Sequence, residues 1–149
     1  MRSAPRSPEA LHATLMRNNN EPAMNGNGKR SFKLMIVDDS NIMRRRIERS
    51  QHYEDLQLVG TAGNGVEALE LFKKTDPDVV TMDLTMPHMG GIECIGQLVA
   101  LKPAVRILVI SALADKATAV EAMERGANGF LNKPFTDRQL NEAIADLMR

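Results

Sequence analysis

The chain has 149 residues with 19 basic and 19 acidic side chains, so its net charge of zero gives no reason to expect a nucleic acid or a membrane surface as partner. A single cysteine, Cys94, excludes an internal disulfide and fits a reducing compartment. No apolar stretch approaches the ~18 residues of a membrane span and no secretory signal is present, so we expect one soluble, cytoplasmic domain.

The first segment, residues 1–31, differs in composition from the rest of the chain. It contains three prolines and the polar runs Asn18–Asn20 and Asn25–Gly28, and its apolar residues are sparse. Such a segment buries too little surface to offset the entropy that is lost on ordering. We therefore predict a flexible N-terminal extension over 1–31, in which only 10–16 has helical spacing, and a folded domain over 32–149.

From residue 33 onward, short apolar runs alternate with segments of helical spacing. The first run, Leu34–Val37, is apolar at every position, which is typical of a strand buried on both faces of a parallel sheet. Later runs of the same kind end at polar residues or turns. The predicted strands are 33–38, 56–61, 79–82, 106–110 and 129–131.

The first predicted helix begins near Ser40, whose short hydroxyl side chain is a good helix cap. We expect its apolar residues Ile42, Met43 and Ile47 to face the core. The three arginines at 44–46 are expected to lie largely on the solvated face, and a contact with a phosphate or a partner is the alternative.

The later helices are delimited by capping residues and by proline or glycine. Asn64, followed by Glu67, resembles a capping box, although asparagine replaces the usual serine or threonine. Thr136, followed by Gln139, is expected to cap the final helix. Helical spacing is shown by Val66, Leu69 and Phe72, by Ile92, Ile95, Leu98 and Val99, by Ala117, Val120 and Met123, and by Leu140, Ile144 and Leu147.

Five strand–helix pairs in alternation predict an α/β fold with right-handed crossovers and a parallel sheet covered on both faces. The strand order does not follow from the pattern itself. A five-stranded doubly wound sheet most often has the flavodoxin-like order 2-1-3-4-5, and we predict this order.

In that order the first, third and fourth strands are neighbours, and ligands of such sheets bind beyond the carboxyl ends of the strands. Each of these strands, and the fifth, is followed by a residue suited to metal or phosphate chemistry, and we expect these residues to converge on one edge. Singly, each could be a turn cap, a solvated acid or a surface lysine. They are Asp38 and Asp39 after the first strand, Asp83 after the third, Ser111 after the fourth and Lys133 after the fifth.

Three carboxylates at one edge repel one another unless a cation or a proton intervenes. An oxygen-only set of ligands with room for water suits Mg²⁺. A carboxylate beside this metal can act as a nucleophile toward a phosphoryl group and form an acyl phosphate. Lys133 would then neutralise phosphoryl oxygens, and the short hydroxyl of Ser111 would donate to one of them.

Four motifs stand at these strand ends: Ile36–Ser40 (Ile-Val-Asp-Asp-Ser), Thr81–Pro87 (Thr-Met-Asp-Leu-Thr-Met-Pro), Val109–Ala112 (Val-Ile-Ser-Ala) and Asn132–Phe135 (Asn-Lys-Pro-Phe). Together and in this order they resemble the response-regulator receiver domains, over a match that extends from residue 33 to residue 149. The second motif is similar to that of the stand-alone, CheY-type chemotaxis regulators. The resemblance implies a phosphorylation switch in two-component signalling rather than an enzyme.

The resemblance also implies a role for each acidic residue. Asp83 would be the phosphoacceptor, taking its phosphoryl group from a sensor histidine kinase. Asp39, Asp83 and the backbone carbonyl of Thr85 would bind Mg²⁺ directly, and Asp38 would assist through a water molecule.

The remaining implied roles concern phosphoryl binding and output. Lys133 and Ser111 would bind the phosphoryl group, and Ser111 with Phe130 would form the switch pair. Ser111 would move toward the phosphate as Phe130 turns inward. The protein, expected to be a monomer, would then bind a downstream target, either a flagellar switch protein in chemotaxis or a phosphotransfer protein in a phosphorelay.

Two features depart from the family or allow another function. The family usually has aspartate where this chain has Gly90, which we expect to loosen that loop. A phosphatase of the haloacid dehalogenase type also uses an aspartate nucleophile after an apolar strand, but it needs a second carboxylate two residues later, where this chain has Thr85. A scaffold with a vestigial site is a further alternative, and the complete set of five residues argues against it.

Overall fold

The computed structural model describes residues 23–24, 30–112 and 116–149. Most of the predicted N-terminal extension, including its helical spacing at 10–16, lies outside the described residues. Two of its residues form the strand β1 (Ala23–Met24), which pairs in an antiparallel sense with the start of β2 (Arg30–Val37). The first strand of the domain therefore begins three residues before the predicted position, inside the segment assigned to the extension.

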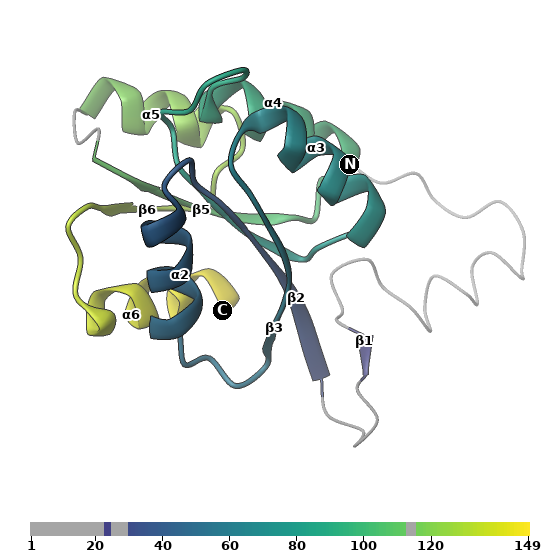
Figure 1. Cartoon of the computed structure of the whole chain (residues 1–149), viewed down its shortest axis with the longest axis vertical. Coiled ribbons are helices and arrows are strands. Elements are labelled where there is room, and N and C mark those ends of the chain that lie inside the picture. The colour runs from purple at the N-terminus through teal and green to yellow at the C-terminus, as the bar shows by residue number, and fades with distance from the viewer. Residues whose placement is uncertain (1–22, 25–29, 113–115) are drawn as a thin grey trace, which may run out of the picture.

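The central sheet contains five parallel strands in the predicted order (Figure 1). Neighbouring strands are hydrogen-bonded in the sequence β3, β2, β4, β5, β6, which is the order 2-1-3-4-5 when β1 is left aside. The carboxyl ends of β2 and β4 therefore lie side by side at the point where the chain order reverses. The strands after β2 are Leu56–Ala62 (β3), Val79–Met82 (β4), Arg106–Ser111 (β5) and Gly129–Asn132 (β6).

Helices cover both faces of this sheet (Figure 1). The helices α2 and α6 lie on one face, and α3, α4 and α5 lie on the other. Within the described residues, none of these helices has the length and apolar character needed to cross a membrane. Their bounds are Asn41–Ser50 (α2), Gly65–Thr75 (α3), Gly91–Leu101 (α4), Lys116–Glu124 (α5) and Asp137–Met148 (α6).

The strand β2 shows why an uninterrupted apolar run was required. Leu34 and Ile36 belong to the core on the α2–α6 side, whereas Met35 and Val37 belong to the core on the α3–α5 side. All four are at most 1% exposed, because successive side chains of a strand point to opposite faces and both faces are covered.

Capping residues begin three of the helices, as expected. The Ser40 hydroxyl accepts a hydrogen bond from the Met43 backbone, and Thr136 forms a complete capping box with Gln139. Asn64 also caps its helix by accepting from the Glu67 backbone N–H. The predicted reciprocal bond is different, because the Glu67 carboxylate accepts from the backbone N–H at position 63.

One assignment of a residue to the buried face of a helix was wrong. Ile42 is 81% exposed, because it stands five residues before the buried Ile47 and cannot share a helical face with it. In α5 the spaced residues Val120 and Met123 are exposed, and the buried residue is Ala122. The small side chain of Ala122 allows α5 to pack closely, so the apolar spacing identified the helix but not its buried face.

Candidate functional site

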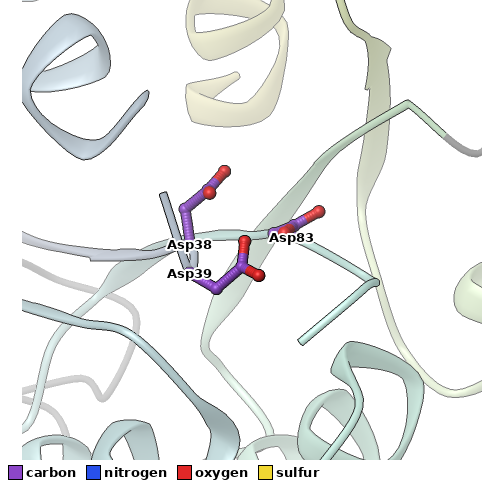
Figure 2. A group of neighbouring side chains, drawn as sticks. All are labelled: Asp38, Asp39 and Asp83. Carbon is purple, nitrogen blue, oxygen red and sulfur yellow. The ribbon is translucent and has the colours of Figure 1, made fainter. Parts of the chain in front are cut away.

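The backbone fixes two aspartates at the carboxyl edge of the sheet. The Asp38 N–H donates to the Ala62 carbonyl over 3.0 Å, and the Asp83 N–H donates to the Val37 carbonyl over 2.9 Å. These bonds extend the strand pairing by one residue past β2 and β4. The two carboxylates are therefore held by the sheet itself, and Asp39 follows at the next position (Figure 2).

The three carboxylates form one cluster. Asp38, Asp39 and Asp83 each offer an oxygen, and these oxygens all lie within 4.8 Å of one another. Asp38 and Asp83 are 1% and 5% exposed, whereas Asp39 is open to solvent. The prediction that the ends of the first and third strands would meet is thus confirmed in geometry.

Lys133 joins the cluster from the loop after β6. Its Nζ lies 2.7 Å from Asp38 Oδ2 and 3.6 Å from Asp83 Oδ1. Its backbone N–H donates to the Ser111 carbonyl over 2.9 Å, which continues the pairing of β5 and β6 by one residue. The hydrogen bonds of the sheet therefore place the lysine, and the ammonium reaches across to both buried carboxylates.

Asp83 is the carboxyl group of the cluster whose pKa is clearly raised. Burial, and then the charge of Asp38, raise the pKa of Asp83 from 3.8 to about 6, although Lys133 partly opposes this. Asp38 is better compensated, since it accepts from Lys133 at one oxygen and from the Ser40 N–H, at 2.9 Å, at the other. A divalent cation would supply the missing positive charge, and the all-oxygen ligand set suits Mg²⁺.

The other predicted site residues lie on β5, on β6 and in the loop after β4. Ser111 is completely buried at the end of β5, opposite Asn132 in the pairing with β6. Thr85 is exposed, and its backbone N–H lies 3.5 Å from Asp83 Oδ1. Phe130 is partly buried and packs against the core on the α3–α5 side. The inward turn predicted for Phe130 on phosphorylation stays a prediction.

The start of α4 packs tightly against the backbone of Asp83. A Cβ at Gly91 would overlap the Asp83 carbonyl oxygen and approach Leu84 Cα to 2.7 Å. Only glycine fits at this position, and this close approach lets the loop after β4 return directly into α4. Gly90, which precedes it, is the N-cap of α4 and supplies no side-chain hydrogen bond.

Two arginines contribute to the site although the sequence interpretation placed them in solvent. Arg44 Nη1 donates to the Asp38 carbonyl over 2.6 Å, and Arg46 donates to the Phe135 carbonyl. Their spacing offered a signal: Arg44 and Arg46 flank the buried stripe of Met43 and Ile47, where a long side chain can cross an apolar surface to reach a polar group.

Comparison with known proteins agrees with this geometry. The family model described as response regulator receiver domain matches residues 34–145. The chemotaxis protein CheY of Listeria monocytogenes is 38% identical over 113 residues, which cover 76% of this chain and 95% of that protein.

Solved structures show the same similarity. A chain of the CheX–CheY–BeF3–Mg²⁺ complex from Borrelia burgdorferi gives a TM-score of 0.77 at 28% identity, covering 85% of this chain and 96% of that one. The response regulator domain of Thermotoga maritima CheB gives 0.71 at 34% identity, covering 80% and 95%.

Proposed function

This chain belongs to the response-regulator receiver family, and from that premise we propose that it accepts a phosphoryl group on Asp83 from a histidine kinase and thereby changes its binding to a partner protein. The observation that supports this proposal most strongly is the cluster of three carboxylates with the Lys133 ammonium in contact with two of them. A lysine and three acids, brought together from three strand ends, are the groups that phosphoryl transfer to a carboxylate needs.

In the proposed reaction an Asp83 carboxylate oxygen forms a bond to phosphorus while the P–N bond of a phosphohistidine breaks. The electron pair of that bond stays on the imidazole nitrogen, which takes a proton from solvent. With a pKa of about 6, Asp83 is mostly ionised at neutral pH and available as the nucleophile. The Lys133 ammonium lies close enough to Asp83 to neutralise negative charge on the oxygens of a phosphoryl group bound there. We assign Ser111 as a hydroxyl donor to the same oxygens.

The metal of this proposal is Mg²⁺. Asp39, Asp83 and the Thr85 carbonyl would hold it, with Asp38 acting through a water molecule. When bound, the ion neutralises charge on the phosphoryl oxygens during transfer.

Phosphoacceptance is tested by labelling with a ³²P-phosphorylated histidine kinase and with acetyl phosphate. We expect the wild type to form a label that hydroxylamine removes, as an acyl phosphate requires, and Asp83→Asn to form none. Asp146→Asn is the matched control, since its side chain is 66% exposed beside Arg149 at the end of α6. Labelling of Asp83→Asn at the wild-type rate would refute the assignment.

Metal binding is tested through thermal stability. Mg²⁺ at about 100 times its Kd should stabilise the folded protein by roughly 2.7 kcal/mol through mass action. Asp39→Asn should weaken this stabilisation, because Asp39 is a proposed ligand, and NaCl at equal ionic strength should not reproduce it. An equal response of the wild type to both salts would argue against a specific metal site.

The partner is proposed from the relatives. The matched proteins of Listeria monocytogenes and Borrelia burgdorferi carry the name CheY, which favours a chemotaxis target such as the flagellar switch protein. Handing the phosphoryl group to a histidine phosphotransfer protein is the alternative. Phosphorylated and unphosphorylated protein should be compared in pull-downs with both candidates, and phosphorylation-dependent retention by one of them identifies the output.

A hydrolytic enzyme is a weaker candidate. The residue two positions after Asp83 is Thr85, whose hydroxyl cannot serve as the general acid that such a phosphatase needs. Rapid multiple turnover of p-nitrophenyl phosphate would be required to revive this function.

A further inference from the structure

The run of three arginines on α2 divides into one exposed residue and two that bind backbone. Arg45 is exposed, whereas Arg44 and Arg46 are partly buried. Arg44 donates to the carbonyl of Asp38 in the loop after β2, and Arg46 donates to the carbonyl of Phe135 in the loop after β6. One helix thus contacts two of the three loops that supply charged groups to the acidic cluster, namely the loops after β2 and β6.

Arg46 makes three kinds of contact with the short segment 135–137. Besides the hydrogen bond to the Phe135 carbonyl, its guanidinium carbon lies 4.5 Å from the centroid of the Phe135 ring. Its Nη2 also lies 3.8 Å from Asp137 Oδ1, at the first turn of α6. A planar guanidinium can stack on a ring and donate at its edge at the same time, which an ammonium cannot do.

The segment that Arg46 holds lies next to Lys133 in the chain. Only Pro134 separates Lys133 from Phe135, and its ring restricts the backbone between them. On the other side, the Lys133 backbone is fixed by its N–H bond to Ser111. Lys133 is therefore held between the end of the sheet and the contact of Phe135 with Arg46.

The contact between Phe135 and Arg46 is held in place because the Phe135 ring is buried. Phe135 is 3% exposed and belongs to the core between the sheet and the helices α2 and α6. A shift of the ring would alter the path of the loop, and with it the reach of the Lys133 ammonium toward Asp38 and Asp83, now 2.7 and 3.6 Å away.

We propose that Arg46 is a positioning residue for phosphoryl transfer, which acts by holding the loop that carries Lys133. The inference rests on the proposed function, since it assumes that Lys133 serves a phosphoryl group on Asp83. It assigns to the middle of α2 a role that the arginine run alone did not suggest, and it leaves Arg45 without one.

The test measures the rate of labelling by acetyl phosphate with Mg²⁺ in the full chain. We expect Arg46→Gln to lower the rate by about tenfold, because small errors in the placement of a catalytic group reduce rates by factors of this order or more. Arg46→Lys should restore only part of the loss, since it keeps the charge but not the stacked, hydrogen-bonded plane. Arg45→Gln is the matched control and should label at the wild-type rate.

A double-mutant cycle separates positioning from a general loss of structure. In a Lys133→Ala background, Arg46→Gln should cause no further loss, because its effect passes through the lysine that is already absent. A further tenfold loss in that background would overturn the proposal, as would wild-type labelling by Arg46→Gln in the parent chain. Retained stabilisation by Mg²⁺ shows that each variant is folded, and Arg46→Lys carries the cycle if Arg46→Gln does not fold.

The two proposals fail in different ways. If the wild type takes no label on Asp83, the proposed function is wrong and the cycle has no signal. If the wild type is labelled and Arg46→Gln matches it, phosphoacceptance stands and the pairing of β5 with β6 alone positions Lys133.

Discussion

Both edges of the parallel sheet place aspartates beside a lysine, but the carboxylates are paired to different degrees. At the amino edge, Lys102 Nζ lies 3.1 Å from Asp76 Oδ1 and 3.3 Å from Asp78 Oδ1. The same ammonium donates to the carbonyls of Asp76 and Pro77. The second oxygen of Asp78 accepts from the Lys33 backbone N–H over 2.8 Å. Both oxygens of Asp78 therefore have donors.

At the carboxyl edge, three carboxylates gather and Lys133 is the cation that forms ion pairs with them in the described part of the chain. Lys133 contacts Asp38 and Asp83, and Asp83 still has a pKa raised to about 6. The same residue types, aspartate and lysine, therefore serve different purposes at the two edges of the sheet. The amino edge pairs its charges and holds strands together, whereas the carboxyl edge keeps a surplus of negative charge that a metal ion can compensate.

The largest effect is expected at the amino edge. Asp78→Ala removes the side-chain acceptor of the Lys33 N–H and one of the partners of Lys102 Nζ, so we expect the free energy of unfolding to fall by about 3 kcal/mol. Urea denaturation measures this change. Asp146→Ala, at an exposed ion pair, should cost less than about 0.5 kcal/mol. A loss below about 1 kcal/mol for Asp78→Ala would mean that this edge is not a structural clamp.

At the carboxyl edge we expect the removal of an aspartate to raise the free energy of unfolding. The folded protein holds a proton on Asp83 up to about pH 6, whereas the unfolded chain releases it near the ordinary pKa of 3.8. Stability of the metal-free wild type therefore falls as pH rises from about 4 to 6 and then levels off. Asp83→Asn escapes this loss, and we expect it to be more stable than the wild type by roughly 2 kcal/mol at pH 8 and about equal at pH 4.

Urea denaturation in a chelator across this pH range tests that prediction. The difference between the wild type and Asp83→Asn should open between pH 4 and about 6, the raised pKa of Asp83. A difference that does not change with pH would show that the variant acts through packing and not through the titration of the carboxyl group. Saturating Mg²⁺ should reverse the order, since only the wild type keeps the full ligand set.

Much of this architecture could be predicted from the sequence, because it follows from short-range patterns. The run Leu34–Val37 required a strand buried on both faces, and aspartates directly after strands had to stand at the edge of the sheet. The strand order could not be derived and was predicted from what such sheets commonly adopt. The beginning of β2 was misplaced because Arg30–Phe32 has no apolar signal beyond one aromatic residue.

Side-chain partners were the part that sequence could not supply. Nothing in the spacing shows that Lys133 pairs more closely with Asp38 than with Asp83, because this depends on rotamers set by the folded backbone. The partly buried positions of Arg44 and Arg46 were missed for the same reason. A long cationic side chain near a buried stripe can reach solvent or a carbonyl, and only the neighbouring loops decide which.

An intermediate effect is expected inside the sheet, between the two edges. The Thr81 hydroxyl in β4 is buried and forms no hydrogen bond within the described part of the chain. Thr81→Val should stabilise the protein by about 1 kcal/mol, because it removes an unpaired buried polar group. Thr75→Val is the control, since the Thr75 hydroxyl donates to the Leu71 carbonyl over 2.7 Å and its removal should bring no gain. Equal gains in both variants would indicate a general benefit of valine.

The smallest change in stability is expected at Gly90, where variants test whether the carboxylates of the carboxyl edge repel a further negative charge at the start of α4. Gly90 caps α4 without a side chain, and a Cβ there would meet only the Leu84 carbonyl, at 3.7 Å, so a larger residue fits. Gly90→Asn should stabilise the protein by a few tenths of a kcal/mol through a new cap. Gly90→Asp offers the same hydrogen bond and a favourable charge at the helix terminus, but it adds a fourth carboxylate near Asp83.

We therefore expect Gly90→Asn to be the more stable of these two variants in metal-free, low-salt buffer, with the difference shrinking as Mg²⁺ or salt is added. Thermal denaturation of the pair, under matched conditions, measures this difference directly. If Gly90→Asp is the more stable variant without metal, the attraction of the helix terminus exceeds the repulsion from Asp83. The repulsion among the three clustered carboxylates would then not be strong enough at the start of α4 to destabilise a further carboxylate there.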